Sequence, residues 1–193
     1  MRKKSSKKPL ASLEHVLKFR RALTLESERG CALLAGAYLD CELEKLLIAK
    51  LVSNHKVTAD FFRPDGPLGS FSARIDLAYL LGLIGKAARN DLHMIRKIRN
   101  EFGHSASSIT FDDQPISSRL KQARHINVDG DARKRHRFTN TVMGVLGVIH
   151  ASYLRCRKTK AKGDDYLDSE FRKVSNEIFK DMLKEFSKKS NDA

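Results

Sequence analysis

The stretch that decides the fold of this chain is Asp91-Leu92-His93-Met94-Ile95-Arg96-Lys97-Ile98-Arg99-Asn100-Glu101-Phe102-Gly103-His104. At about 100° per residue, five apolar positions in it or just before it share one face of a helix: Ala88, Leu92, Ile95, Ile98 and Phe102. Arg99 projects onto the same face. An unpaired buried charge costs on the order of several kcal/mol, so its guanidinium needs a carboxylate, a bound anion or a route to water. Gly103 is expected to end the helix as its C′ residue, with His104 just outside.

Composition predicts one domain with a real core. The chain has 193 residues, of which 41% are hydrophobic, and this excludes wholesale disorder. No apolar run reaches the roughly 20 residues that span a bilayer, and no apolar segment follows the N-terminal lysines. We therefore expect neither a membrane helix nor a signal peptide, and a cytoplasmic protein.

Cysteine and histidine placement predicts no metal site and no cofactor. The cysteines are odd in number and lack paired metal-ligand spacing: Cys31, Cys41 and Cys156. His93 with His104 or His125 completes no ligand set on one helix face. We expect three reduced thiols.

The charge balance favours contact with polyanions, either nucleic acid or an acidic protein. The net charge is +14 and the pI is near 9.9. Two basic clusters in the second half are the candidate nucleic-acid-binding residues: Arg133, Lys134, Arg135 and Arg137, then Arg155, Arg157 and Lys158. The alternative is that these are solvated basic segments with no phosphate contact.

Helical periodicity predicts an all-α, single-domain bundle of about six or seven helices. The expected helices cover 13–25, 27–50, 71–81, 86–102, 117–124, 138–154 and 166–186. No segment alternates as a strand would. The helix over 27–50 looks central because small residues, Gly36 among them, allow a neighbouring helix to approach closely. Gly144 and Gly147 are expected to do the same in 138–154.

The expected domain covers 11–188. Residues 1–10 form a basic tail without periodicity, and we expect both this tail and residues 189–193 to be disordered.

A loop over 62–69 holds two prolines and two glycines and is expected to be a rigid turn, with Ser70 capping the next helix. It lacks the Gly-Lys-Ser/Thr ending of a nucleotide-binding loop and follows no predicted strand, so a structural turn is favoured over phosphate binding. Four acids of the central helix are candidates to pair with Arg74 or Arg99, and the sequence does not choose among them: Glu28, Asp40, Glu42 and Glu44.

Residues 78–100 loosely suggest a helix-turn-helix, with Gly82 in the turn. The second helix is predicted to pack in the core through Leu92, Ile95 and Ile98, which leaves little for a base-reading face. An ordinary helical hairpin is the favoured interpretation.

Several of these motifs in order resemble the mannitol operon repressor family. They are Glu26–Gly30, Ala37–Asp40, Gly66–Ile75 and Asp91–Phe102 with His104. The resemblance covers roughly residues 13–104 and continues less distinctly to about 154. The motif residues are Glu28, Arg29, Asp40, Gly66, Pro67, Ser70, Arg74, Arg96 and Arg99. The resemblance implies a cytoplasmic, all-helical regulator that represses sugar-uptake genes and has no evident classical DNA-reading helix.

A second resemblance competes over six residues. Arg99-Asn100-Glu101-Phe102-Gly103-His104 is similar to the Arg-polar-x-x-x-His motif of the HEPN superfamily, which includes metal-independent ribonucleases. It implies that Arg99 stabilises the scissile phosphate, that His104 acts on the ribose 2′-hydroxyl and that Asn100 holds the local geometry. The structural alternative has Arg99 bridging to an acid of the central helix. Anion binding without chemistry is a third reading.

The resulting hypothesis is a negative transcriptional regulator without enzyme activity. Its partner is DNA, contacted through the two basic clusters, or another transcription regulator. A homodimer is possible, and no membrane contact is expected. The alternative is the ribonuclease that uses Arg99 and His104.

Overall fold

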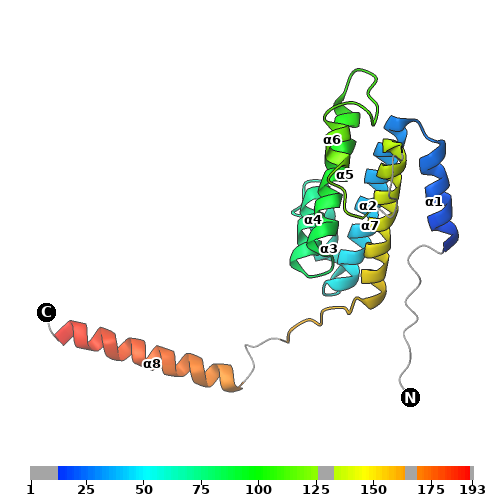
Figure 1. Cartoon of the computed structure of the whole chain (residues 1–193). Coiled ribbons are helices and arrows are strands. Elements are labelled where there is room, and N and C mark those ends of the chain that lie inside the picture. Colours follow the sequence, from blue (N-terminus) through cyan, green and yellow to red (C-terminus); the bar gives the residue numbers. More distant parts are fainter. Residues whose placement is uncertain (1–12, 126–132, 164–168, 192–193) are drawn as a thin grey trace, which may run out of the picture. The chain divides into compact units, whose positions relative to one another are not determined.

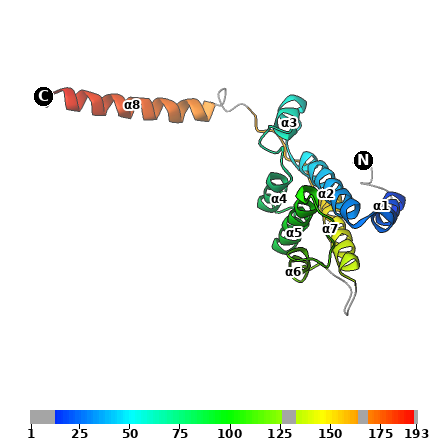
Figure 2. The ribbon, with the colours of Figure 1, turned by 90° about the horizontal axis from the view of Figure 1, so that it is seen from above.

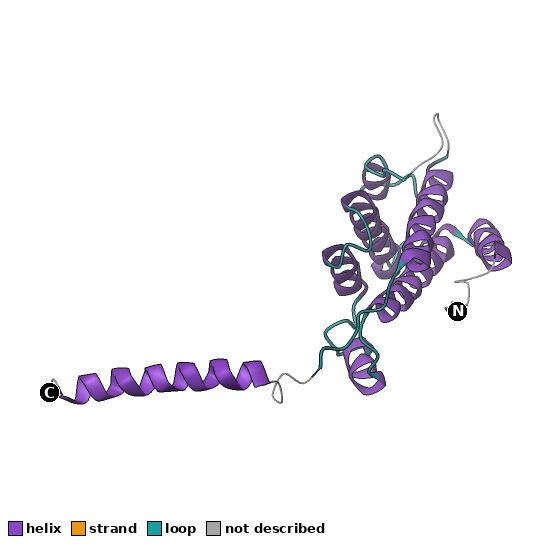
Figure 3. Ribbon diagram, turned by 90° about the horizontal axis from the view of Figure 1, so that it is seen from below, coloured by secondary structure: helices purple, strands orange, loops and turns teal. Residues whose placement is uncertain are grey.

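A computed structural model describes residues 13–125, 133–163 and 169–191 of the chain. These residues form eight helices and no strand (Figure 3). The helices are α1 (Leu13–Leu25), α2 (Glu28–Lys50), α3 (His55–Phe62), α4 (Phe71–Leu80), α5 (Lys86–His104), α6 (Ile116–Leu120), α7 (Lys134–Arg155) and α8 (Ser169–Asn191). The all-α class is confirmed, whereas the expected six or seven helices fall short of the eight observed.

The helix that the sequence analysis missed is α3. Its N-cap is Asn54, whose side-chain oxygen accepts a hydrogen bond from the backbone nitrogen of Val57 at 3.1 Å. Only Phe62 of this helix is buried, so the segment shows no apolar stripe. The capping asparagine was the signal that could have revealed it.

The central position predicted for residues 27–50 is confirmed by α2. This helix packs against α1, α4, α5 and α7, and the view from above shows α5 and α7 beside it (Figure 2). The hydroxyl of Ser27 accepts a hydrogen bond from the backbone nitrogen of Gly30 at 3.0 Å and caps it. Its buried positions are Cys31, Ala32, Ala35, Gly36, Leu39, Glu42, Leu43, Leu46 and Leu47.

The apolar face predicted for α5 is buried at every position. The predicted end of the helix at Gly103 is wrong, because the helix continues through His104, with Ser105 as its C-cap. The backbone nitrogen of Ser105 still donates to the carbonyl of Glu101 at 3.1 Å. Among the described glycines only Gly82 has a positive φ, 65°, and it makes the expected turn between α4 and α5.

Two other bounds differ from expectation. α7 begins at Lys134 rather than near Phe138, because its first turn is basic and carries no apolar periodicity. α6 ends at Leu120, before the expected Arg124. α1, α2 and α7 lie side by side, with α4 to α6 beyond α2 (Figure 1).

The chain forms two compact units, Met1–Thr159 and Lys160–Ala193. The first holds α1 to α7 and the hydrophobic core. The second holds α8, in which residues 169–185 are exposed. This helix runs to Asn191 and so enters residues 189–193, which were expected to be disordered. The basic tail, residues 1–10, lies outside the described residues. The domain bounds 11–188 stay a prediction.

Candidate functional site

Arg74 joins the loop over 62–69 to the central helix. Its Nη1 lies 2.9 Å from Oδ1 of Asp40 and 3.0 Å from Oε2 of Glu44, and only 9% of the Arg74 side chain is exposed. Its Nε and Nη2 donate to the carbonyls of Leu68, at 2.8 Å, and Phe62, at 3.3 Å. Among the four candidate acids of the central helix, Arg74 pairs with Asp40 and Glu44.

The rest of this loop is also structural. A Cβ at Gly66 would collide with the backbone carbonyls of Asp60 and Phe61. Ser70 caps α4, since its hydroxyl accepts a hydrogen bond from the backbone nitrogen of Ala73 at 3.1 Å. Pro67 is exposed between Gly66 and the buried Leu68. A rigid turn with Ser70 as the cap is the predicted arrangement, and it is confirmed.

Glu28 and Arg29 fix the segment that follows α5. Oε2 of Glu28 accepts a hydrogen bond from the backbone nitrogen of Phe111 at 2.7 Å. Nη2 of Arg29 donates to the carbonyls of Ser105, at 2.8 Å, and Ser107, at 3.0 Å. These two motif residues hold the C-terminal end of α5 against the start of α2.

Arg99 and His104 have different surroundings. The side chain of Arg99 lies against Gly36 of α2, where a Cβ would meet Cγ of Arg99 at 2.9 Å. Burial raises the pKa of Asp40, whereas the charges of Arg74 and Arg99 act to lower it. His104 is exposed and lines a pocket of about 380 Å³ together with Asn100. Arg99 is not among the lining residues of that pocket.

The two basic clusters of α7 are far apart. Arg133 directly precedes the helix and Arg155 ends it, so about 30 Å separates the clusters at 1.5 Å per residue. Arg155, Arg157 and Lys158 are exposed. The structure does not bring the two clusters together into one surface.

Several cations of the first cluster already have protein partners. Nζ of Lys134 lies 3.1 Å from Oδ1 of Asp112. Nε of Arg137 donates to the carbonyl of Leu120 at 3.0 Å. Arg135 closes the end of α1, since its Nη2 donates to the carbonyls of Leu23, Thr24 and Glu26. Arg133 is exposed.

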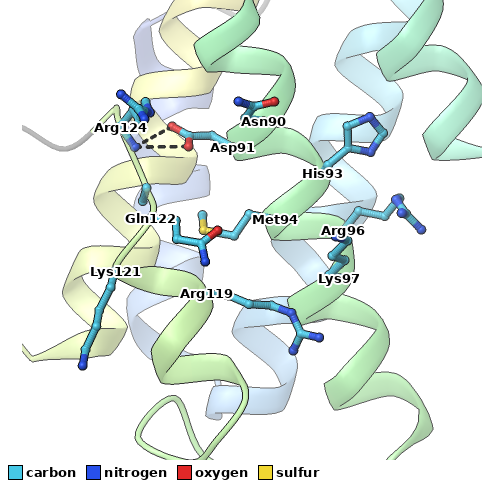
Figure 4. Close-up of a pocket in the computed structure, with 11 residues that line it drawn as sticks. Asn90, Asp91, His93, Met94, Arg96, Lys97, Arg119, Lys121, Gln122 and Arg124 are labelled. Atoms are coloured by element: carbon cyan, nitrogen blue, oxygen red, sulfur yellow. Dashed lines mark hydrogen bonds between the residues drawn. The ribbon is translucent and has the colours of Figure 1, made fainter.

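The structure gathers a third set of cations in a groove between α5 and the segment that contains α6. The groove has a volume of about 980 Å³. Its five cationic residues are Arg96, Lys97, Arg119, Lys121 and Arg124. Figure 4 shows Met94 and Gln122 in its middle, with Arg96 and Lys97 on α5 and the other three cations across from them. We call this the α5–α6 groove.

The single carboxylate that lines the groove is Asp91, and it is already satisfied. It is 1% exposed and accepts hydrogen bonds from the backbone nitrogens of Arg124, at 3.1 Å, and His125, at 2.9 Å. Nδ1 of His125 lies 2.7 Å from its Oδ2. Asp91 therefore anchors one wall of the groove and leaves the cations to face solvent.

Two guanidiniums of the groove are only partly satisfied. Nε of Arg96 is buried and has no hydrogen-bond partner in the part of the chain that the structure describes. Nη1 of Arg119 lies 3.1 Å from Oε1 of Glu101, an ion pair at an angle that does not make a hydrogen bond. Buried donors are normally hydrogen-bonded, so the Nε of Arg96 is an exception in this groove.

A neighbouring ion cluster lies beside the groove. A hydrogen bond from His93 lowers the pKa of Asp76, and Arg89 acts in the same direction. Nε2 of His93 lies 3.0 Å, and Nη2 of Arg89 lies 2.7 Å, from Oδ1 of Asp76. Asp76 thus neutralises Arg89, and the five cations of the groove are distinct from this cluster.

Sequence reasoning missed the groove because three of its cations fall in a segment without periodicity. Only Arg96 had been singled out, as a motif residue. The signal was the basic spacing of Arg119, Lys121 and Arg124 at the end of a short helix and directly after it. Periodicity does not predict which side of α5 such a segment covers.

Two absences are limited to the described ranges. No three side chains of the His, Cys, Asp or Glu type come together there as a metal-binding group. None of the helices in these ranges is long and apolar enough to cross a membrane.

A family model described as "Mannitol repressor" matches residues 52–144 of this chain. The matched region starts and ends later than the motif resemblance over 13–104. Two curated relatives are the mannitol operon repressors of Escherichia coli strains K12 and O6:H1 CFT073. Each is 36% identical to this chain over 52 residues. Those residues span 27% of this chain and 27% of each relative.

The fold is also similar to a solved structure, whose title is "X-ray structure of the MtlR-HPr complex from Escherichia coli". The TM-score is 0.53, and the match covers 72% of this chain and 96% of that one at 16% sequence identity. At that identity the likeness shows the fold alone. Together with the family model, these matches confirm the resemblance that the motifs predicted.

Proposed function

Because residues 52–144 of this chain belong to the mannitol repressor family, we propose that the protein is a negative regulator of transcription of sugar-uptake genes. The observation that carries this proposal is the family match. The motif residues Arg29 and Arg74 support the helical scaffold through buried or capping contacts. A recognition helix is not part of the proposal, because α5 uses its apolar face for the core.

For the mode of repression we propose contact with a protein partner. The solved relative with this fold is in a complex with HPr, and that complex motivates the proposal for this chain. Direct DNA contact through the α7 clusters is the other mode. It receives less support, because the clusters lie at opposite ends of the helix and Arg135 and Arg137 bind carbonyls.

Transcript levels test the regulatory role. In a strain that lacks this chain, we expect transcripts for the uptake of a sugar or sugar alcohol to rise, and to fall again on complementation. If no such transcript changes under growth on any of these carbon sources, the regulatory proposal is wrong. Calorimetric titration of the purified chain with HPr from the same cells separately tests the mode. Heat of binding supports a protein partner, whereas no binding contradicts HPr as that partner.

We further propose that the chain has no enzyme activity of its own. The ribonuclease alternative requires Arg99 and His104 to converge on one phosphate, but Arg99 lies against Gly36 while His104 lines a pocket without it. Labelled RNA incubated with the purified chain should stay intact. Cleavage that is lost in His104→Ala, with folding retained, would establish the ribonuclease instead.

A further inference from the structure

We propose that the α5–α6 groove binds the phosphate backbone of duplex DNA. This inference goes beyond the proposed function, since binding at the groove can be measured whether or not the chain represses transcription. It also replaces the α7 clusters as the expected place of phosphate contact. The argument rests on charge, on unpaired donors and on the chemistry of the lining residues.

Charge is the first step. Five cationic side chains line the groove, and the one carboxylate among the lining residues, Asp91, is bound by backbone nitrogens. The exposed members are Lys97, Lys121 and Arg124. No ion pair of these three side chains is seen in the described residues. The five cations outnumber the two carboxylates beside them, Asp91 and Glu101. Such a cationic surface attracts a polyanion and releases its counterions on binding.

The donors are the second step. Phosphate oxygens in DNA complexes accept hydrogen bonds from Arg, Lys, Asn and Gln side chains. Asn90 and Gln122 line the groove next to its cations. Lys97, Lys121 and Arg124 add exposed charged donors. This set of donors suits a run of phosphates better than a single small anion.

The third step separates DNA from other macromolecules. The centre of a protein interface is depleted in charge and enriched in aromatic residues, whereas DNA interfaces are polar and strongly positive. The groove is lined by five cations, and no aromatic ring other than the imidazole of His93 lines it. Single-stranded nucleic acid would require aromatic platforms for its bases. Duplex phosphate fits this lining better than an acidic protein or a single strand.

The experiment compares two variants of the full chain that lose the same charge. The groove variant is Lys97→Gln, Lys121→Gln, Arg124→Gln. The control variant is Arg155→Gln, Arg157→Gln, Lys158→Gln, at the far end of α7. All six side chains are exposed, so the substitutions spare the core. Fluorescence anisotropy with a labelled 25-base-pair duplex, at several salt concentrations between about 50 and 200 mM, gives the affinity and its salt slope.

We expect the groove variant to lose the contacts and the control to keep them. Each lost phosphate contact lowers the slope of log affinity against log salt by about 0.9, so three lower it by roughly 2.7. At 0.1 M salt, relative to 1 M, this corresponds to an affinity loss of roughly 500-fold. The control should lie within about threefold of the unmodified chain. A charge-preserving variant, Lys97→Arg, Lys121→Arg, Arg124→Lys, should bind like the unmodified chain.

Three outcomes would overturn the proposal. Equal losses in both variants would mean that net charge alone binds DNA. A loss confined to the control would place the contact at the end of α7. Loss of binding of a poly-glutamate peptide in the groove variant, with no duplex affinity lost, would assign the groove to an acidic protein. Circular dichroism melting of each variant confirms that it is folded.

Discussion

At the scale of single residues, Arg74 should contribute more to stability than the exposed Arg63. Arg63 lies in the loop over 62–69 and Arg74 in α4, and Arg74 binds two carboxylates and two carbonyls in the interior. Arg63 pairs with Asp65 at 3.2 Å, where both side chains are more than half exposed. The two arginines differ in the burial of their ion pairs rather than in ion-pair geometry.

Arg74→Ala should therefore destabilise the protein strongly. It leaves Asp40 partly buried beside the unpaired carbonyl of Leu68, and breaking a buried pair costs about 3 kcal/mol or more. Arg63→Ala should cost no more than about 0.5 kcal/mol, because exposed pairs contribute little. Urea unfolding of both variants measures the two free energies. Similar losses would show that Arg74 is not a link between the turn and α2.

Protonation of Glu42 should make the stability of the protein depend on pH. Burial would raise the pKa of this carboxyl, but hydrogen bonds from His150 and Lys45 outweigh burial and lower it. Because the pKa is lower in the folded state, ionised Glu42 stabilises the protein above its ordinary pKa. That contribution is lost as the pH falls through the lowered value. The carboxyl is 1% exposed, so its protonation affects the interior.

Glu42→Gln should reduce the stability difference between pH 7 and pH 4. The amide cannot ionise, so the part of the acid sensitivity that comes from Glu42 disappears, although stability at pH 7 also falls. Urea unfolding at the two pH values measures this difference. Glu14→Gln, at an exposed pair with Lys18, is the control and should leave the pH dependence unchanged. An unaltered difference in Glu42→Gln would contradict the assignment.

At the scale of helices, two glycines inside helices have different surroundings. Gly36 in α2 faces Arg99 of α5, where a Cβ would lie 2.9 Å from Cγ and 3.2 Å from Cβ of that arginine. Gly147 in α7 has nothing within 4 Å of the same position. Both are helical and lie inside their helices, so the difference lies in the neighbouring helix.

Alanine substitutions should thus shift stability in opposite directions. Gly36→Ala pushes α5 away from α2, and this overpacking outweighs the better helix propensity of alanine for a net loss on the order of 1 kcal/mol. Gly147→Ala gains about 0.5 to 1 kcal/mol from helix propensity alone. Thermal unfolding of both variants gives the two signs. A stabilised Gly36→Ala would mean that the two helices do not touch there.

Sequence patterns predicted helices well where an apolar stripe was continuous, and poorly where polar residues began or ended a helix. The stripe of α5 and the central position of α2 were both predicted. The start of α7 and the whole of α3 were missed, because their polar turns carry no period. Of the expected close approaches in α7, Gly144 lies against the backbone of His125 and Gly147 lies against nothing. Which residues meet across two helices depends on how the helices pack, and the periodicity of one helix does not predict this.

At the scale of the whole molecule, the same limit applies to the groove. Its cations come from α5 and from a segment some 20 residues later, and only the fold places the two across from each other. The two basic clusters of α7 could be found in the sequence because their residues are adjacent along the chain. Net charge predicted a polyanion partner, and the family match does not test that expectation.

The division of the chain at Thr159 leads to the last prediction. Residues 1–159 should fold without the rest, because the described core lies in this unit and residues 169–185 of α8 are exposed. The backbone nitrogen of Thr159 donates to the carbonyl of Lys50 at 2.7 Å, which fixes the end of the unit. A chain ending at Thr159 should keep its free energy of unfolding within about 1 kcal/mol of the full chain in urea, since little apolar area is removed from the core.

A chain ending at Leu154 is the matched comparison. It lacks the buried Cys156 and the bond of Thr159, and we expect it to be less stable. A large loss already on truncation at Thr159 would mean that α8 completes the core, as a single domain over 11–188 requires.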